Sequence, residues 1–90
     1  MRVERGSVDL EAVAGAWLHG QVQAARRERL TARIDGLVPR CLAVCDGARA
    51  AALLRLRDEI QAASLGDMRR RFSAYRALLD RFESRLSPLN

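Results

Sequence analysis

The sequence predicts an all-α fold on three observations. Ala, Leu and Arg supply 15, 13 and 16 of the 90 residues, and all three favour helix. Strand-forming residues are few, with two Ile, one Thr and six Val, and nowhere do they alternate with polar residues. Finally, apolar side chains in the last third of the chain recur alternately three and four residues apart, which is typical of a helix with one narrow apolar stripe. We call this stripe the seam; it comprises Leu65, Met68, Phe72, Tyr75, Leu79, Phe82, Leu86 and Leu89.

A chain of 90 residues is long enough for one domain. We expect a single helical domain over residues 1–90, with helices at approximately 8–35, 37–64 and 66–87. Because the connections between them are very short, consecutive helices should be antiparallel neighbours. The predicted architecture is therefore an antiparallel three-helix bundle (up-down-up) with coiled-coil-like packing, which a second copy of the chain can extend to a dimer.

The sequence marks the start of the first helix clearly, but its middle contains helix-breaking signals. Ser7 is a good N-cap, and Asp9 and Glu11 follow in the first turn, where the helix dipole favours acids. The apolar pattern fades after Gly20, and glycine costs about 1 kcal/mol relative to alanine in a helix interior. A break near Gly20 is therefore the alternative to one helix reaching Asp35. The face expected to be apolar carries Leu10, Val13 and Trp17.

The second helix is predicted from turn residues at its start. Asp35 and Gly36 mark a boundary, and Pro39 then falls in a first turn, whose amides have no partner within the helix. Asp46–Gly47 should kink or split this helix, since the phase of the apolar pattern changes after Ala51. The residues expected to be buried are Leu37, Cys41, Val44, Ala48, Ala51, Leu53, Leu56, Ile60 and Ala63.

The third helix has the clearest boundaries. Ser64 and Asp67 have the spacing of a capping box, which places the start of the helix near residues 65–67. Ser87–Pro88 should end it, because proline disfavours helix at the preceding residue. The seam therefore lies on one helix of about six turns.

The net charge is +5, with no Lys, and residues 65–90 carry six Arg against three acids. No apolar signal core follows the N-terminus and no apolar run approaches the length of about 20 residues that crosses a bilayer. We therefore expect a cytoplasmic protein without a membrane span. An amphipathic helix lying on a membrane is the alternative for residues 67–86, but the seam is narrower than a lipid-facing surface needs.

The chain offers little catalytic chemistry. Cys41 and Cys45 supply only two of the four ligands of a structural zinc and lack the C-x-x-C spacing of a redox pair, so we expect them to pack as reduced thiols. His19 has no partner Ser, Cys or acid at a recognisable spacing and should lie at the surface or at its boundary with the core. Phosphate-binding loops and nucleophile motifs are absent from the sequence. We therefore expect no enzyme activity, no catalytic residues, no metal and no cofactor.

The seam favours a protein-protein interaction module that acts in assembly, chaperoning or regulation. The partner would be a second copy of the chain, giving a homo-oligomer, or a helical segment of another protein. Trp17 is expected to anchor the first helix against the seam. The predicted partner-binding residues are Met68, Phe72, Tyr75, Leu79, Phe82, Leu86 and Trp17.

The alternative is a DNA-binding regulator with a helix-turn-helix-like segment at residues 61–76. The arginines that would face phosphates or base edges are Arg69, Arg70, Arg71 and Arg76. Gln61 stands at a position that is usually apolar, and Asp67 would repel phosphate. In an up-down-up bundle the other basic group, at residues 26–29, should lie roughly 20 Å from Arg69 along the axis. The two basic groups should then form separate surfaces.

Overall fold

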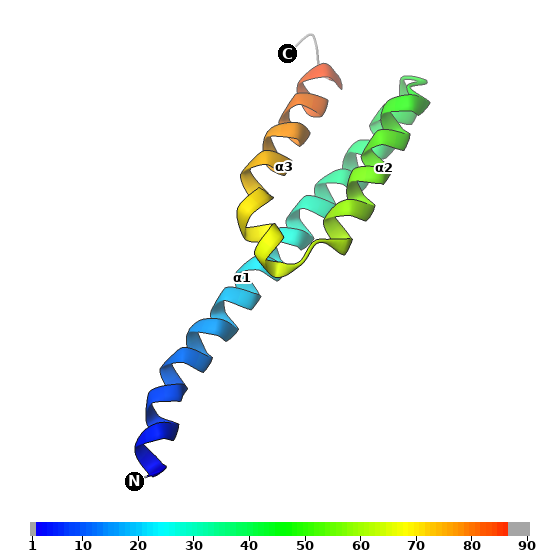
Figure 1. The fold of residues 1–90 in the computed structure, drawn as a ribbon. Helices are drawn as coiled ribbons and strands as arrows, with labels where there is room; N and C mark the ends of the chain where they lie inside the picture. Colours follow the sequence, from blue (N-terminus) through cyan, green and yellow to red (C-terminus); the bar gives the residue numbers. More distant parts are fainter. Residues whose placement is uncertain (1, 87–90) are drawn as a thin grey trace.

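A computed structural model describes the backbone of residues 2–86 and the side chains from Leu10 onward. This part of the chain is helical throughout apart from two short turns and contains no strand, which confirms the all-α prediction. The helices are α1 (Arg2–Ala43), α2 (Gly47–Ala62) and α3 (Leu65–Leu86). In Figure 1 the chain turns back after α1 so that α2 lies beside its second half, and it turns again before α3.

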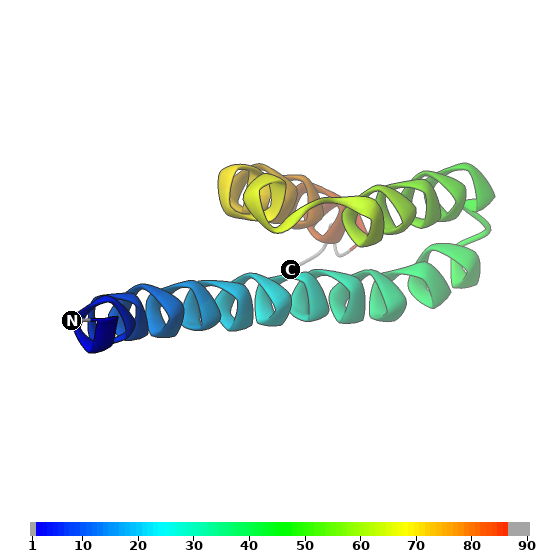
Figure 2. The ribbon, with the colours of Figure 1, turned by 60° about the horizontal axis from the view of Figure 1, so that its bottom comes forward.

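The molecule is elongated because α1 is long and its first half stands alone. With 42 residues, α1 is about 63 Å long, close to the longest molecular extent of 67 Å. Both shorter helices pack on α1, and the α1 residues of the core all lie between Leu30 and Cys41, in its second half. Figure 2 shows α2 and α3 on the same side of α1, with the N-terminal half of α1 extending beyond them.

The predicted boundary at Asp35–Gly36 is wrong, and so is the alternative break near Gly20. The helix runs through all of these positions and includes Pro39 in its interior. Packing explains why: Leu37 and Cys41, on either side of Pro39, are buried, whereas Pro39 itself is exposed. Burial of that face offsets the hydrogen bond that proline cannot donate. The residues of α1 that form the core are Leu30, Ile34, Leu37 and Cys41.

The end of α1 is a left-handed cap at Cys45, whose φ is 59°. The amide of Asp46 donates to the carbonyl of Cys41 at 2.9 Å and that of Cys45 to the carbonyl of Leu42 at 3.0 Å. This is the Schellman pattern, in which glycine usually occupies the left-handed position. Asp46 then caps α2 by accepting from the amide of Arg49 at 3.0 Å. The expected interruption at Asp46–Gly47 is thus a complete helix boundary.

The predicted core of the second helix is partly wrong. Val44 lies in the turn and is 61 % exposed, and Ala48 and Ala51 face solvent. The difference between the predicted and the observed helix boundary explains these exposures. Val44 does not belong to a helix, and the contacts of α2 with α1 determine which face of α2 is buried. The residues of α2 that are buried are Ala50, Leu53 and Ile60.

Candidate interaction surfaces

The seam closes within the chain. Met68 and Leu79 have no exposed surface, and Tyr75 is 3 % exposed. The half-buried seam residues packed against this core are Phe72, Phe82 and Leu86. Leu65, at the start of α3, is 39 % exposed, and Leu89 lies outside the described residues. The side chains that were expected to bind a partner therefore hold α3 on its own bundle.

Trp17 does not anchor α1 against the seam, so that expectation is wrong. Its side chain is 62 % exposed. The first residue of α3, Leu65, lies beside Gly20: its Cδ1 is 3.8 Å from where a Cβ on that glycine would be. Since α3 starts there and runs toward the other end of the molecule (Figure 1), Trp17 lies beyond the reach of the seam.

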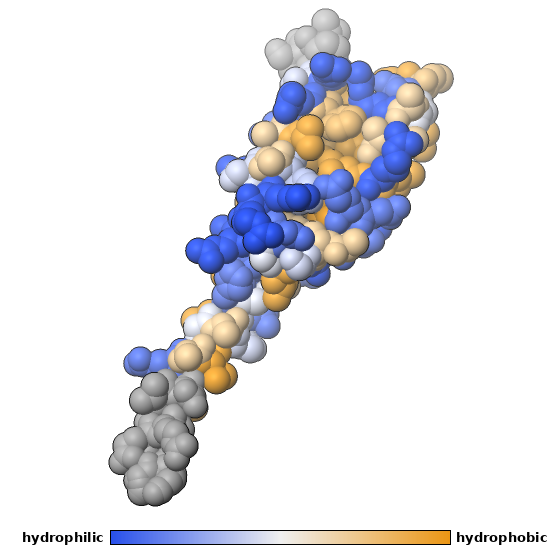
Figure 3. Space-filling model, viewed as in Figure 1, coloured by the Kyte–Doolittle hydropathy of each residue, from blue (hydrophilic) through white to orange (hydrophobic). Residues whose placement is uncertain are grey.

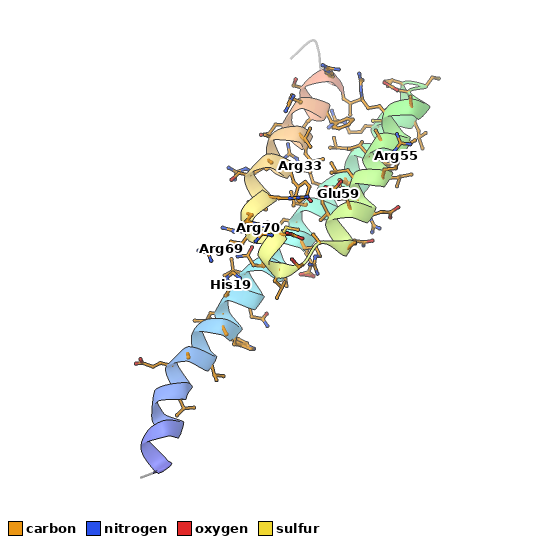
Figure 4. All side chains as sticks on the ribbon, viewed as in Figure 1. His19, Arg33, Arg55, Glu59, Arg69 and Arg70 are labelled. Carbon is orange, nitrogen blue, oxygen red and sulfur yellow. The ribbon has the colours of Figure 1, made fainter. Side chains whose placement is uncertain are left out.

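Exposed apolar side chains gather in residues 10–22 of α1. We call residues 10–22 the arm. The next residue along the helix, Gln23, is only 3 % exposed and marks the point where the bundle begins. The only charged side chain in this segment is Glu11, and His19 lies near its bundle end (Figure 4). The exposed apolar residues of the arm are Leu10 at 69 %, Val13 at 62 %, Trp17 at 62 %, Leu18 at 57 % and Val22 at 46 %.

Leu10, Val13 and Trp17 recur at intervals of three and four residues, so they lie along one side of the arm. At about 100° per residue, this side is turned by roughly a third of a circle from the face that Leu30 and Ile34 bury in the bundle. The apolar side of the arm is therefore a separate surface and does not continue the internal core.

Two basic groups that were expected to lie apart meet on one surface, and the expected separation is wrong. The guanidinium carbons of Arg26 and Arg29, from α1, lie 4.8 and 5.8 Å from the centroid of the Phe72 ring. That of Arg76, from α3, lies 5.6 Å from the same centroid. The reason is again that α3 starts beside the middle of α1. We call Arg26, Arg29 and Arg76 the arginine cluster.

Residues 61–76 form the end of α2, a two-residue turn and the first half of α3. Gly66 is the second residue of α3. Ser64 caps α3, as the sequence predicts, with its Oγ accepting from the amide of Asp67 at 3.0 Å. A hydrogen bond from the Ser64 side chain to the carboxylate of Asp67, together with the charge of Arg70, holds the pKa of Asp67 below its usual value.

The four arginines proposed to contact DNA differ in their surroundings. Arg70 is paired with Asp67, and Arg71 lies 3.9 Å from Oε2 of Glu59. The hydroxyl of Tyr75 beside Arg71 raises the pKa of that guanidinium. Arg76 joins the arginine cluster, and Arg69 is exposed. These side chains leave α3 in several directions, and only Arg69 and Arg76 share the face of Phe72.

The cysteines have different environments. Both are free thiols; Cys41 is fully buried in the core, as expected, whereas Cys45 is exposed in the turn, so the expectation that it packs is wrong. Among the described residues, no group of three or more His, Cys, Asp or Glu side chains is placed to hold a metal ion. The half-buried His19 lies at the junction of the arm and α3.

A pocket of about 160 Å³ lies between α2 and α3, near the ends of these helices that are distant from the arm. Its apolar wall comes from Leu78 and Phe82. The arginines at its rim are Arg49, Arg81 and Arg85. Figure 3 shows hydrophobic surface in this region between the two helices. The sequence did not indicate it, because it depends on how α2 and α3 diverge over α1.

The chain matches no protein-family model, no characterised protein and no solved structure. No helix among residues 2–86 combines the length and apolar character needed to cross a membrane.

Proposed function

We propose that this protein is a non-catalytic interaction module, an up-down-up helical bundle that presents the arm to a protein partner. The observation that carries the proposal is the 62 % exposure of Trp17 on a helix that projects beyond its own bundle. Tryptophan is among the residues most enriched at binding hot spots. The partner is a second copy of the chain or a helical segment of another protein.

The energetics of the arm support a partner. Burying apolar surface contributes roughly 25 cal/mol per Å², and Leu10, Val13 and Trp17 leave most of theirs in water. The arm continues α1 beyond the bundle and so lacks the tertiary packing that stabilises most helices in proteins, and Gly15 weakens it further by about 1 kcal/mol relative to alanine. Nothing within 4 Å of Gly15 would contact a Cβ there. A bound partner helix would supply the packing that the chain itself does not provide.

The seam has an indirect role in this proposal. By closing against α1, α3 fixes the second half of that helix and leaves the first half free to project. Met68 and Leu79 are thus structural residues, and the partner-contacting residues are on the arm. An exposed stripe of leucine, valine and tryptophan suits a helical partner, because side chains at intervals of three and four residues pack into a helical groove.

The proposal is tested by affinity capture from the native host with matched variants. One variant carries Trp17→Ser and Leu18→Ser on the arm. The control carries Leu54→Ser and Leu42→Ser, which alter leucines that are 47 % and 57 % exposed elsewhere on the molecule. We expect a partner to be recovered with the parent and the control but not with the arm variant. Equal recovery with all three proteins would contradict the arm as the binding surface.

A further inference from the structure

Three guanidinium groups surround one aromatic ring. Arg26, Arg29 and Arg76 each lie within 6 Å of the centroid of the half-buried Phe72 ring, at 4.8, 5.8 and 5.6 Å. Each gains from the negative face of the ring, but the three cations also repel one another. One aromatic ring does not neutralise three positive charges. The three arginines therefore concentrate an excess of positive charge around the Phe72 ring.

No carboxylate among the described residues pairs with this cluster. The side chain of Arg26 donates instead to the neutral amide oxygen of Gln23, at 3.3 Å. One turn further along the same interface between α1 and α3, an arginine is paired with carboxylates. There, Arg33 is bound by Asp80 at 2.6 Å and Glu83 at 2.7 Å. These two carboxylates raise the pKa of Arg33 through hydrogen bonds. The contact between the helices is thus neutralised at Arg33 and left cationic around Phe72.

The cationic surface extends along the start of α3. Arg69 is exposed, stands three residues before Phe72 and shares its face of the helix. Arg69 stands on the first turns of α3, and the first residue of this helix, Leu65, lies beside Gly20 of α1. Figure 3 shows a continuous hydrophilic surface over this junction. The cluster and Arg69 together present four guanidinium groups from two helices.

We propose that the arginine cluster, with Arg69, binds the phosphate backbone of a nucleic acid. Guanidinium groups match phosphate oxygens in planar, bidentate geometry. A nucleic-acid strand supplies phosphates at regular spacing, so several cations can be paired at once. The arginines come from two packed helices and surround a ring. This arrangement suits contact with a phosphate backbone. It does not present a single helix that could enter a groove and read base edges. This binding is independent of the sequence of the nucleic acid and of the proposed arm function.

The test compares two triple variants of the full chain in binding to a labelled duplex DNA at several salt concentrations. The site variant is Arg26→Gln, Arg29→Gln, Arg76→Gln. The control is Arg55→Gln, Arg81→Gln, Arg85→Gln, which removes the same charge from exposed arginines on α2 and on the far half of α3. Arg55 lies on the side of the molecule away from Arg69 (Figure 4). Circular dichroism and thermal unfolding establish that both variants are folded.

We expect the parent and the control to bind with an affinity that falls steeply as salt rises. The site variant should bind at least roughly tenfold more weakly, and the slope of log K against log salt should decrease by about 0.9 for each phosphate that the variant no longer neutralises. Equal weakening in both variants would show that net charge alone is responsible and would overturn the proposal. So would the absence of binding by the parent, or competition by polyglutamate as effective as that by unlabelled DNA.

Discussion

The hydroxyl of Tyr75 donates a hydrogen bond to Oε2 of Glu59 at 2.9 Å, joining α3 to α2. Tyr75 is only 3 % exposed. Burial raises the pKa of Tyr75 above its usual value of 10.0, and the hydrogen bond to Glu59 raises it further, while Arg71 acts in the opposite direction. The folded protein therefore keeps the phenol proton at pH values where the unfolded chain loses it.

This relationship predicts alkaline destabilisation. The stability that comes from a protonated Tyr75 is fully present below pH 10.0, its unfolded value, and is lost as the pH rises through the higher folded pKa. Because the chain has one tyrosine, tyrosinate absorbance reports this group alone. We expect the pH midpoint of the Tyr75 titration to be higher in the native protein than in the denatured chain. The Tyr75→Phe substitution should lower the unfolding free energy by about 1 kcal/mol near neutral pH. Above pH 10, the unfolding free energy of this variant should decline less than that of the parent. A native midpoint at or below the denatured one would contradict the account.

The burial of the seam predicts an order of destabilisation. Leu79 has no exposed surface, whereas Phe72 and Phe82 are half-buried. Leu79→Ala should reduce the unfolding free energy by about 2–5 kcal/mol. Phe82→Ala should cost less than the roughly 3–5 kcal/mol of a fully buried phenylalanine, since its pocket is open to water. Urea denaturation measures both changes, and a larger loss for Phe82→Ala than for Leu79→Ala would contradict this order.

Pro39 predicts a stabilising substitution. It lies inside α1, is exposed and has no amide hydrogen to donate. Pro39→Ala restores that donor, and we expect the unfolding free energy to rise by up to about 3 kcal/mol. Gly36→Ala is a suitable positive control: nothing lies within 4 Å of its added Cβ, and the expected gain is about 1 kcal/mol. Chemical denaturation that finds Pro39→Ala less stable than the parent would show that α1 does not continue through this position.

Local patterns in the sequence predict α3 well. The expected helix over residues 66–87 is found at Leu65–Leu86, and Met68, Tyr75 and Leu79 of the predicted stripe are buried. Two short-range features account for this agreement. The stripe sets the buried face, and Ser64 caps the first turn.

The length of α1 was not predictable from local signals. Asp35, Gly36 and Pro39 are residues that usually end a helix, yet burial of Leu37 and Cys41 carries α1 to Ala43. That burial depends on α2 and α3, which approach from elsewhere in the chain. A prediction from neighbouring residues does not include those contacts.

The exposed arm and the arginine cluster both follow from the difference between the predicted and the observed helix boundaries. A second helix over residues 37–64 would return to the start of the first, and would bring α3 beside Trp17. The observed α2 has 16 residues and ends near Arg27, whose Nη2 donates to the carbonyl of Ala63. As a result, α3 starts beside the middle of α1. Trp17 is left beyond it, and Phe72 meets Arg26.

The most direct measurement of the proposed function is site-specific photo-crosslinking from the arm in the native host. A photo-reactive residue replaces Val13, which is 62 % exposed, and, in a matched control, Leu54, which is 47 % exposed on α2. We predict a discrete adduct from position 13 that is absent from position 54 and is lost when Trp17→Ala is added. An adduct of twice the chain mass would identify a second copy as the partner, and another mass would identify a different protein. No adduct from position 13, or equal adducts from both positions, would contradict the arm as the interaction surface.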